Sequence, residues 1–161
     1  MRDRKAVATT PPVRRALVCI LVLCFAIPAS AGASTSLARQ VVNGINKQRR
    51  AHGLAPLRLA TPLGRVAGSH SRFMARVGRL QHESADGTSA TTRIRRAMRV
   101  RRAGEAIAYA SDARAIVRSW MASPPHRKLI LSRSYRIIGV GVVRGTFSSY
   151  RVLYATADLG A

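Results

Sequence analysis

Residues Arg136 to Ala157 read RIIGVGVVRGTFSSYRVLYATA, and this stretch decides the fold class. Two segments rich in β-branched and aromatic residues, 136–143 and 150–157, are separated by the turn-forming run RGTFSS. This pattern predicts two strands joined as a β-hairpin. A third short apolar segment, GEAIAYA at 104–110, predicts another strand. The sequence therefore predicts a small antiparallel sheet.

The segments that precede these strands have the periodicity of helices. Apolar residues recur on one helical face within 37–53 and again within 61–78, and each segment ends at a glycine. We expect Thr61 to cap the second helix and Pro62 to occupy its first position.

Two more helices are predicted between the second helix and the hairpin. The arginine-rich run within 91–104 keeps a narrow apolar face, which is typical of a short basic helix. A further helix is expected to be capped by Ser111 and closed by the Ser-Pro-Pro sequence at 123–125. Helices followed by paired strands indicate an α+β domain in which helices cover the antiparallel sheet.

The first 33 residues predict a secretion signal. Two arginines, Arg14 and Arg15, precede the uncharged apolar run ALVCILVLCFAI, and small residues then allow cleavage after Ala31 or Ala33. An uncleaved membrane anchor is the alternative reading. The mature chain would contain no membrane span and would be secreted or associated with the cell envelope.

Cysteine usage and charge narrow the chemistry further. Both cysteines lie in the predicted signal, so the mature domain has no thiol nucleophile and no zinc–thiolate site. The chain has 28 Lys and Arg against 6 Asp and Glu, a formal net charge of +22. Such an excess favours anionic partners such as envelope polymers or lipid headgroups. The arginine-rich segment 93–102 is the expected contact.

Three residues stand out as candidates for chemistry. His82 and His126 lie in predicted loops just beyond helix ends, and Glu105 opens an apolar strand, where a buried carboxylate needs partners. Together they predict either a zinc site with an open position or a histidine–glutamate acid/base pair. The alternative is a scaffold that pins loops. His70 is interpreted as a core histidine bonded through a ring nitrogen, and His52 as a solvated one.

Four motifs in order resemble a known family. They are VVNGINKQRRAHGLAPLRLATPLGRVAGSHSRFMARVGRLQHESADG, then GEAIAYA, then SWMASPPHRKLILSRSYRIIGVGV, and finally YATADLG. The set resembles a bacterial secreted domain of the CAP superfamily (SCP domain), which includes cysteine-rich secretory proteins, antigen 5 and pathogenesis-related proteins. The resemblance covers 37–160. It implies an α-β-α sandwich with a shallow cleft, in which two histidines and two acids can bind a divalent metal, zinc above all.

The resemblance also implies roles for single residues. His82 in QHES matches the first cleft histidine, Glu105 in GEAIA the glutamate, and His126 in SPPHR the second histidine. It also places His126 in a short helix entered behind two prolines. Ser123 or a neighbour stands where the second acid is expected, and three usual residues are replaced, by Ala106, Pro125 and Ala157. Because such residues normally orient ligands, we expect these replacements to reduce metal affinity.

Three functions follow from these observations. The first is an extracellular binding or interaction module for cell-envelope or other anionic ligands, with a His/Glu metal cleft. The second is a metal-dependent hydrolase of peptide, glycan or lipid, so the sequence leaves open whether the protein is an enzyme. The third, nucleic-acid binding, is disfavoured by the predicted export signal and by the aromatic content of only 5%. Oligomeric state is not indicated.

Overall fold

The computed structural model describes residues 30–161, and the predicted signal, 1–33, lies almost entirely outside them. The elements in chain order are α1 (Ser30–Ala51), β1 (Arg58–Leu59), α2 (Thr61–Val77), α3 (Ala90–Ala97), β2 (Ala103–Ala110), α4 (Ala113–Ala122), α5 (Pro124–Ile130), β3 (Ile137–Phe147) and β4 (Tyr150–Gly160). Within this part of the chain no helix is both long enough and apolar enough to cross a membrane.

The sheet has four strands in the order β1-β3-β4-β2. The predicted hairpin is confirmed, since β3 and β4 pair antiparallel along their whole length, and β2 pairs antiparallel with β4. The expectation of a purely antiparallel sheet is corrected, because the two-residue β1 pairs parallel with β3. The sequence did not predict β1, since two residues carry no strand periodicity.

The hairpin turn is tighter than predicted. Only Ser148 and Ser149 lie between the strands, because 144–147 continue the ladder with 150–153 instead of forming a loop. Ser148 has a positive φ of 53°. Two-residue hairpin turns require such a conformation but usually obtain it from Asn or Gly. Because no Asn-Gly pair is present, the sequence predicted a hairpin but not a turn of only two residues.

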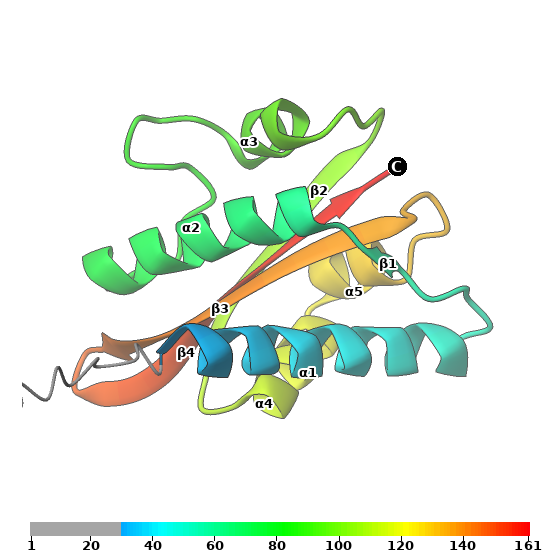
Figure 1. Cartoon of the computed structure of the whole chain (residues 1–161). Helices are drawn as coiled ribbons and strands as arrows, with labels where there is room; N and C mark the ends of the chain where they lie inside the picture. Colours follow the sequence, from blue (N-terminus) through cyan, green and yellow to red (C-terminus); the bar gives the residue numbers. More distant parts are fainter. Residues whose placement is uncertain (1–29) are drawn as a thin grey trace, which may run out of the picture.

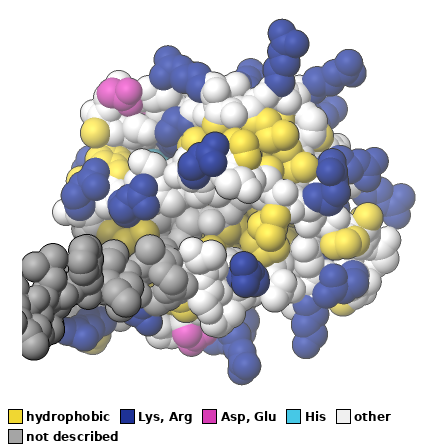
Figure 2. Space-filling view, viewed as in Figure 1, with side chains coloured by type: hydrophobic (Ala, Val, Ile, Leu, Met, Phe, Trp, Pro, Cys, Tyr) yellow, Lys and Arg dark blue, Asp and Glu magenta, His cyan; other side chains and the backbone are white. Residues whose placement is uncertain are grey.

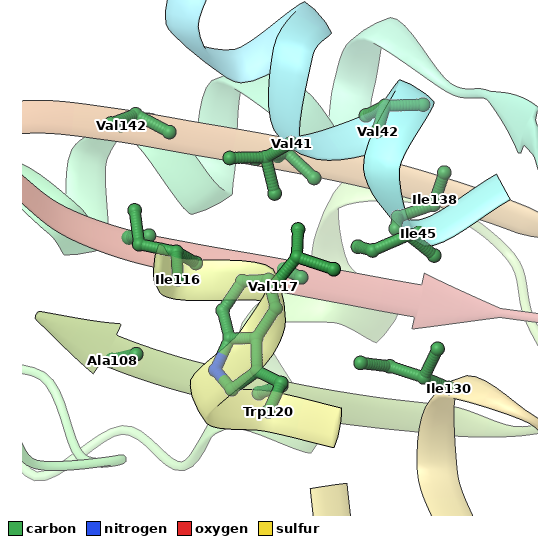
Figure 3. Close-up of a cluster of buried hydrophobic side chains, with 14 of the residues drawn as sticks. Val41, Val42, Ile45, Ala108, Ile116, Val117, Trp120, Ile130, Ile138 and Val142 are labelled. Carbon is green, nitrogen blue, oxygen red and sulfur yellow. The ribbon is translucent and has the colours of Figure 1, made fainter. Parts of the chain in front are cut away.

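Helices cover both faces of this sheet, which confirms the α-β-α arrangement (Figure 1). On one face, side chains of α1, α4 and α5 form the main core with every second residue of the strands. Trp120 is fully buried at its centre, and its indole N–H donates to the Ile107 carbonyl at 3.0 Å (Figure 3). On the other face, α2 and α3 pack through two smaller clusters.

Two predicted N-caps are corrected, and other predicted helix ends are confirmed. Ala60, not Thr61, is the N-cap of α2, because its N–H still donates to Ile138 as the chain leaves β1. Asp112, not Ser111, caps α4, since its carboxylate accepts the Ala115 N–H at 2.8 Å. The Ser-Pro-Pro sequence ends α4 as predicted, with Ser123 as the C-cap. Its prolines begin the short helix α5 that the resemblance placed at His126, as their fixed φ suits a first helical turn. Both predicted terminal glycines adopt the left-handed conformation.

Candidate functional site

Glu105 is the centre of a polar cluster on the α2–α3 side of the sheet. Its side chain is only 1% exposed, and two donors occupy its carboxylate. His82 Nδ1–H donates to Oε1 at 2.7 Å, and Arg93 Nη2–H donates to Oε2 at 2.5 Å. The predicted need of this carboxylate for partners is therefore met by an arginine as well as by a histidine.

Arg93 fastens the loop between α2 and α3 to the sheet. Besides Glu105, its guanidinium donates to the His82 carbonyl at 2.7 Å, the Thr88 carbonyl at 3.0 Å and Ser84 Oγ at 3.1 Å. The side chain is 11% exposed. Arg93 thus belongs to the interior, although the sequence grouped it with the surface arginines of 93–102.

Asp158 lies beside Glu105 as its register partner across β2 and β4. It is fully buried, and neither carboxylate oxygen has a hydrogen-bond partner among the described residues. Burial, and then the charge of Glu105, raises the pKa of Asp158 to about 8. Asp158 therefore keeps its proton at neutral pH, and a protonated carboxyl can donate to the Glu105 carboxylate.

His70 confirms the interpretation as a core histidine and adds to the cluster. It is 2% exposed, its Nε2–H donates to the Gln81 carbonyl at 2.8 Å, and Nε2 lies 3.9 Å from Glu105 Oε2. Burial, opposed in part by the charge of Glu105, lowers the pKa of His70. The ring is therefore neutral near pH 7.

The two candidate histidines differ in their surroundings. His82 is half exposed, and its hydrogen bond to Glu105 raises its pKa. His126 lies in α5 with its Nδ1 hydrogen-bonded to Ser123 Oγ at 3.0 Å. Burial, and then the charge of His82, lowers the pKa of His126. The structure thus joins His82 to Glu105 directly and places His126 within electrostatic reach of His82, without a hydrogen bond to either residue.

The predicted zinc set fits this arrangement poorly. Catalytic zinc sites normally have three protein ligands and structural sites four. Within residues 30–161 no three His, Cys, Asp or Glu side chains are placed to hold a metal ion. The Glu105 side chain is buried, and each of its oxygens accepts a hydrogen bond, so Glu105 can orient His82 but is poorly accessible as a metal ligand. His82 and His126, which are both partly exposed, remain as ligands, and two side chains fall short of a zinc site.

The replaced positions have another explanation. Ala106 and Ala157 are fully buried in the core formed with α1 and α4, on the face of the sheet opposite to Glu105 and Asp158. Successive strand residues point to opposite faces, so these alanines support the core and not the polar cluster. The expectation that they remove support from the cleft is therefore corrected.

Comparisons with known proteins agree with this geometry. The model of the cysteine-rich secretory protein family, CAP, matches residues 42–159. The chain belongs to the CAP family. Relatives of this CAP domain include two uncharacterized Bacillus subtilis proteins, the membrane protein YlbC, 36% identical over 112 residues, and YkwD, 32% identical over 107 residues. The matches cover 68% and 65% of this chain but only 32% and 42% of those proteins, so the chain spans less than half their length.

Solved structures show the same fold. An extracellular SCP-domain protein of Bacillus anthracis matches with a TM-score of 0.67 and 26% identity, covering 79% of this chain and 41% of that one. An outer surface protein of Borrelia burgdorferi matches with a TM-score of 0.64 and 19% identity, covering 76% and 90%. These likenesses confirm the α+β CAP fold.

Arg93, Asp158 and His70 are the cluster residues that the sequence did not single out. Arg93 was hidden among six arginines of similar appearance, and Asp158 ends a strand pattern in which a single acid gives no spacing signal. His70 lay on the apolar stripe of α2, where a core role was the simpler interpretation. Only the register of β2 against β4 and the positions of α2 and α3 on the sheet bring the three together.

Proposed function

We propose that this CAP domain is an extracellular binding module for anionic cell-envelope ligands, and that its His/Glu cluster pins a loop. The observation that carries the proposal is the occupied state of Glu105, which is buried and filled by Arg93 and His82. A carboxylate in this state is ill-suited as a metal ligand or a general base, because its side chain is only 1% exposed and its charge is paired with Arg93. The cluster is therefore better suited to holding structure than to chemistry.

The surface supports attachment to anions. Lys and Arg side chains are spread over the face in Figure 2, where acidic side chains are few, in keeping with the net charge of +22. Besides Arg93, the arginines of the predicted contact segment are exposed: Arg95, Arg96, Arg99, Arg101 and Arg102. A cationic surface of this size attracts anionic polymers and headgroups through long-range Coulomb forces.

An extracellular or envelope location is part of the proposal. It is supported by the predicted signal sequence and by solved relatives that are named as extracellular or outer surface proteins. The absence of cysteine from residues 34–161 also suits export without disulfide formation.

Sedimentation with lipid vesicles tests the proposal. We expect the protein to bind vesicles that contain phosphatidylserine, and to bind pure phosphatidylcholine vesicles much less. Binding should weaken steeply as salt rises from about 0.05 to about 0.5 M, because the Debye length shortens several-fold over this range. Equal binding to both vesicles, or binding insensitive to salt, would contradict the proposal.

A metal-dependent hydrolase is the second candidate. The observation in its favour is that His82 and His126 are both partly exposed and are electrostatically linked. It predicts that His82→Ala and His126→Ala abolish turnover of a peptide, glycan or lipid substrate while vesicle binding survives. Full turnover in both variants would end this alternative.

A further inference from the structure

A groove opens between α2, the loop that follows it, and α3. It encloses about 570 Å³, within the usual size range of small-molecule sites. Val66, His70 and Phe73 line it from one face of α2, and Ala97 lines it from α3. The spacing of these α2 residues places them side by side along the helix. One wall of the groove is therefore apolar, with a single imidazole set into it.

That imidazole carries an unused hydrogen-bond acceptor. The Nε2 atom of His70 faces the Gln81 carbonyl, which can only accept, so the ring proton must be on Nε2. Nδ1 is then a bare lone pair, and no described residue donates to it. A buried acceptor without a partner is unfavourable, because it has lost its hydrogen bond to water without gaining another. The groove therefore favours a ligand that brings an O–H donor.

Two exposed arginines bring positive charge to the groove. Arg76 on α2 and Arg96 on α3 are exposed and line the same groove, whereas Arg93 is neutralised by Glu105. Asp86 also lines the groove. Its carboxylate accepts the Thr88 N–H at 3.0 Å and attracts Arg96, so a bound phosphate competes with Asp86 for that guanidinium group. The two guanidinium groups are suited to bind a phosphate, which arginine recognises through paired hydrogen bonds.

We propose that this α2–α3 groove binds a glycerol phosphate group. The phosphate contacts Arg76 and Arg96, a glycerol hydroxyl donates to His70 Nδ1, and the carbon chain packs on Phe73. Glycerol phosphate chemistry occurs both in polymers and in phospholipid headgroups. The inference rests on the proposed attachment to anionic envelope ligands and names the chemistry that one site selects.

The central experiment measures affinity for two probes at fixed salt. One is a synthetic glycerol phosphate trimer, and the other is a vesicle of phosphatidylglycerol in phosphatidylcholine, so the two arms separate polymer from lipid. The Arg76→Gln/Arg96→Gln variant should lower the affinity for at least one probe by about tenfold or more. The matched control, Arg114→Gln/Arg118→Gln, removes two exposed charges from α4 on the other side of the sheet and should change it less than about threefold.

A second comparison tests the hydroxyl contact. The wild-type protein should prefer the trimer to inorganic triphosphate, which has charge but no hydroxyl-bearing carbon chain. His70→Phe should remove that preference. Because this buried substitution can also unfold the domain, the ¹⁵N resonance of His70 Nδ1 in the wild-type protein gives an independent readout. It should move toward the shift of a hydrogen-bonded nitrogen when the trimer is added.

The outcomes separate this inference from the proposed function. If both double variants weaken binding equally, attachment to anions survives and the α2–α3 groove as a specific site is overturned. An unchanged Nδ1 resonance at saturation would likewise overturn the hydroxyl contact. If no anionic probe binds at all, the proposed function and this inference both fail.

Discussion

Asp158 and Glu105 form a buried carboxyl–carboxylate pair whose stability depends on one proton. Asp158 has a pKa near its ordinary value of 3.8 when unfolded and about 8 in the fold. Between these pH values the folded state binds more protons than the unfolded state. The contribution of Asp158 to the free energy of unfolding is therefore complete below about pH 4 and is lost as pH rises through about 8.

Asp158→Asn should remove this dependence, because the amide stays neutral and can still donate to Glu105. Relative to the variant, the wild-type protein should lose up to about 1.4 kcal/mol of unfolding free energy per pH unit within that window. Urea unfolding at a series of pH values measures the difference in unfolding free energy between the two proteins. The pKa shifts of His70, His82 and His126 occur in both proteins and cancel in this difference. Parallel stability curves for the two proteins would refute the assignment.

Arg93 is the second residue on which the cluster depends. Arg93→Met should destabilise the domain by about 3–5 kcal/mol, because it leaves the buried Glu105 carboxylate without its cation. Arg93→Lys keeps the charge but not the planar guanidinium group, so its stability should lie between that of the wild-type protein and that of Arg93→Met. In the double variant with Glu105→Gln the loss should be smaller than the sum of the single losses.

Chemical denaturation of the wild-type protein, Arg93→Met, Glu105→Gln and the double variant gives the double-mutant cycle. Limited proteolysis within 79–89 reports the release of the loop. If Arg93→Met is as stable as the wild-type protein within about 0.5 kcal/mol, as a surface change would be, the pinning role is wrong.

At the residue scale the sequence predicted that Glu105 and His82 belong to the site, because a carboxylate at the start of an apolar strand must have partners. It did not predict which partners, since Arg93 and Asp158 reach Glu105 only through tertiary contacts. Arg49 shows the same limit. It is 1% exposed and donates to the carbonyls of Ile130 and Ser132, although its sequence context suggests an ordinary basic helix end.

At the scale of elements, α2 lies unusually close to β3 because glycines meet at the crossing. A Cβ on Gly139 would lie 2.1 Å from the Gly64 nitrogen and 2.2 Å from the Leu63 carbonyl carbon. Backbone atoms cannot rotate away as side chains can. This contact sets the height of α2 above the sheet, and with it the position of His70 over Glu105.

Gly139→Ala should therefore destabilise the domain by about 2 kcal/mol or more, as overpacking does. Gly64→Ala is the matched control at the same crossing, since its Cβ would meet only the Val140 carbonyl oxygen at 4.0 Å. Within a helix this change should stabilise by up to about 1 kcal/mol. Thermal or urea unfolding of the two variants measures the contrast. Equal effects would show that the crossing is not close-packed.

The elements themselves were largely predictable, for identifiable reasons. Periodicity located α2 and β2, and Gly78 marked a helix end by its left-handed conformation. The parallel strand β1 was not predictable, because two residues carry no pattern. The cap of α4 was misplaced by one residue, where adjacent Ser111 and Asp112 compete for the same role and the stronger acceptor wins.

At the scale of the whole molecule, the cationic surface and the buried Glu105 cluster both favour a binding module over a metal centre. Most arginines of the segment 93–102 are exposed and can contact an anionic partner. Arg93 differs, because its side chain is mostly buried in the polar cluster and pairs with Glu105. The fold was predictable from four ordered motifs, and the family match over 42–159 confirms it. Metal binding could not be predicted from the same motifs, because it depends on which lone pairs remain free after folding.

Calorimetric titration with zinc tests the central claim that the His/Glu cluster holds structure and is not a metal centre. The wild-type protein and a His82→Ala/His126→Ala variant are titrated side by side, with elemental analysis of the purified proteins. We expect no one-to-one binding at micromolar zinc in either protein, because residues 30–161 do not place three protein ligands around one ion. One-to-one binding by the wild-type protein that is lost in the variant would contradict it, and would make the hydrolase the leading candidate.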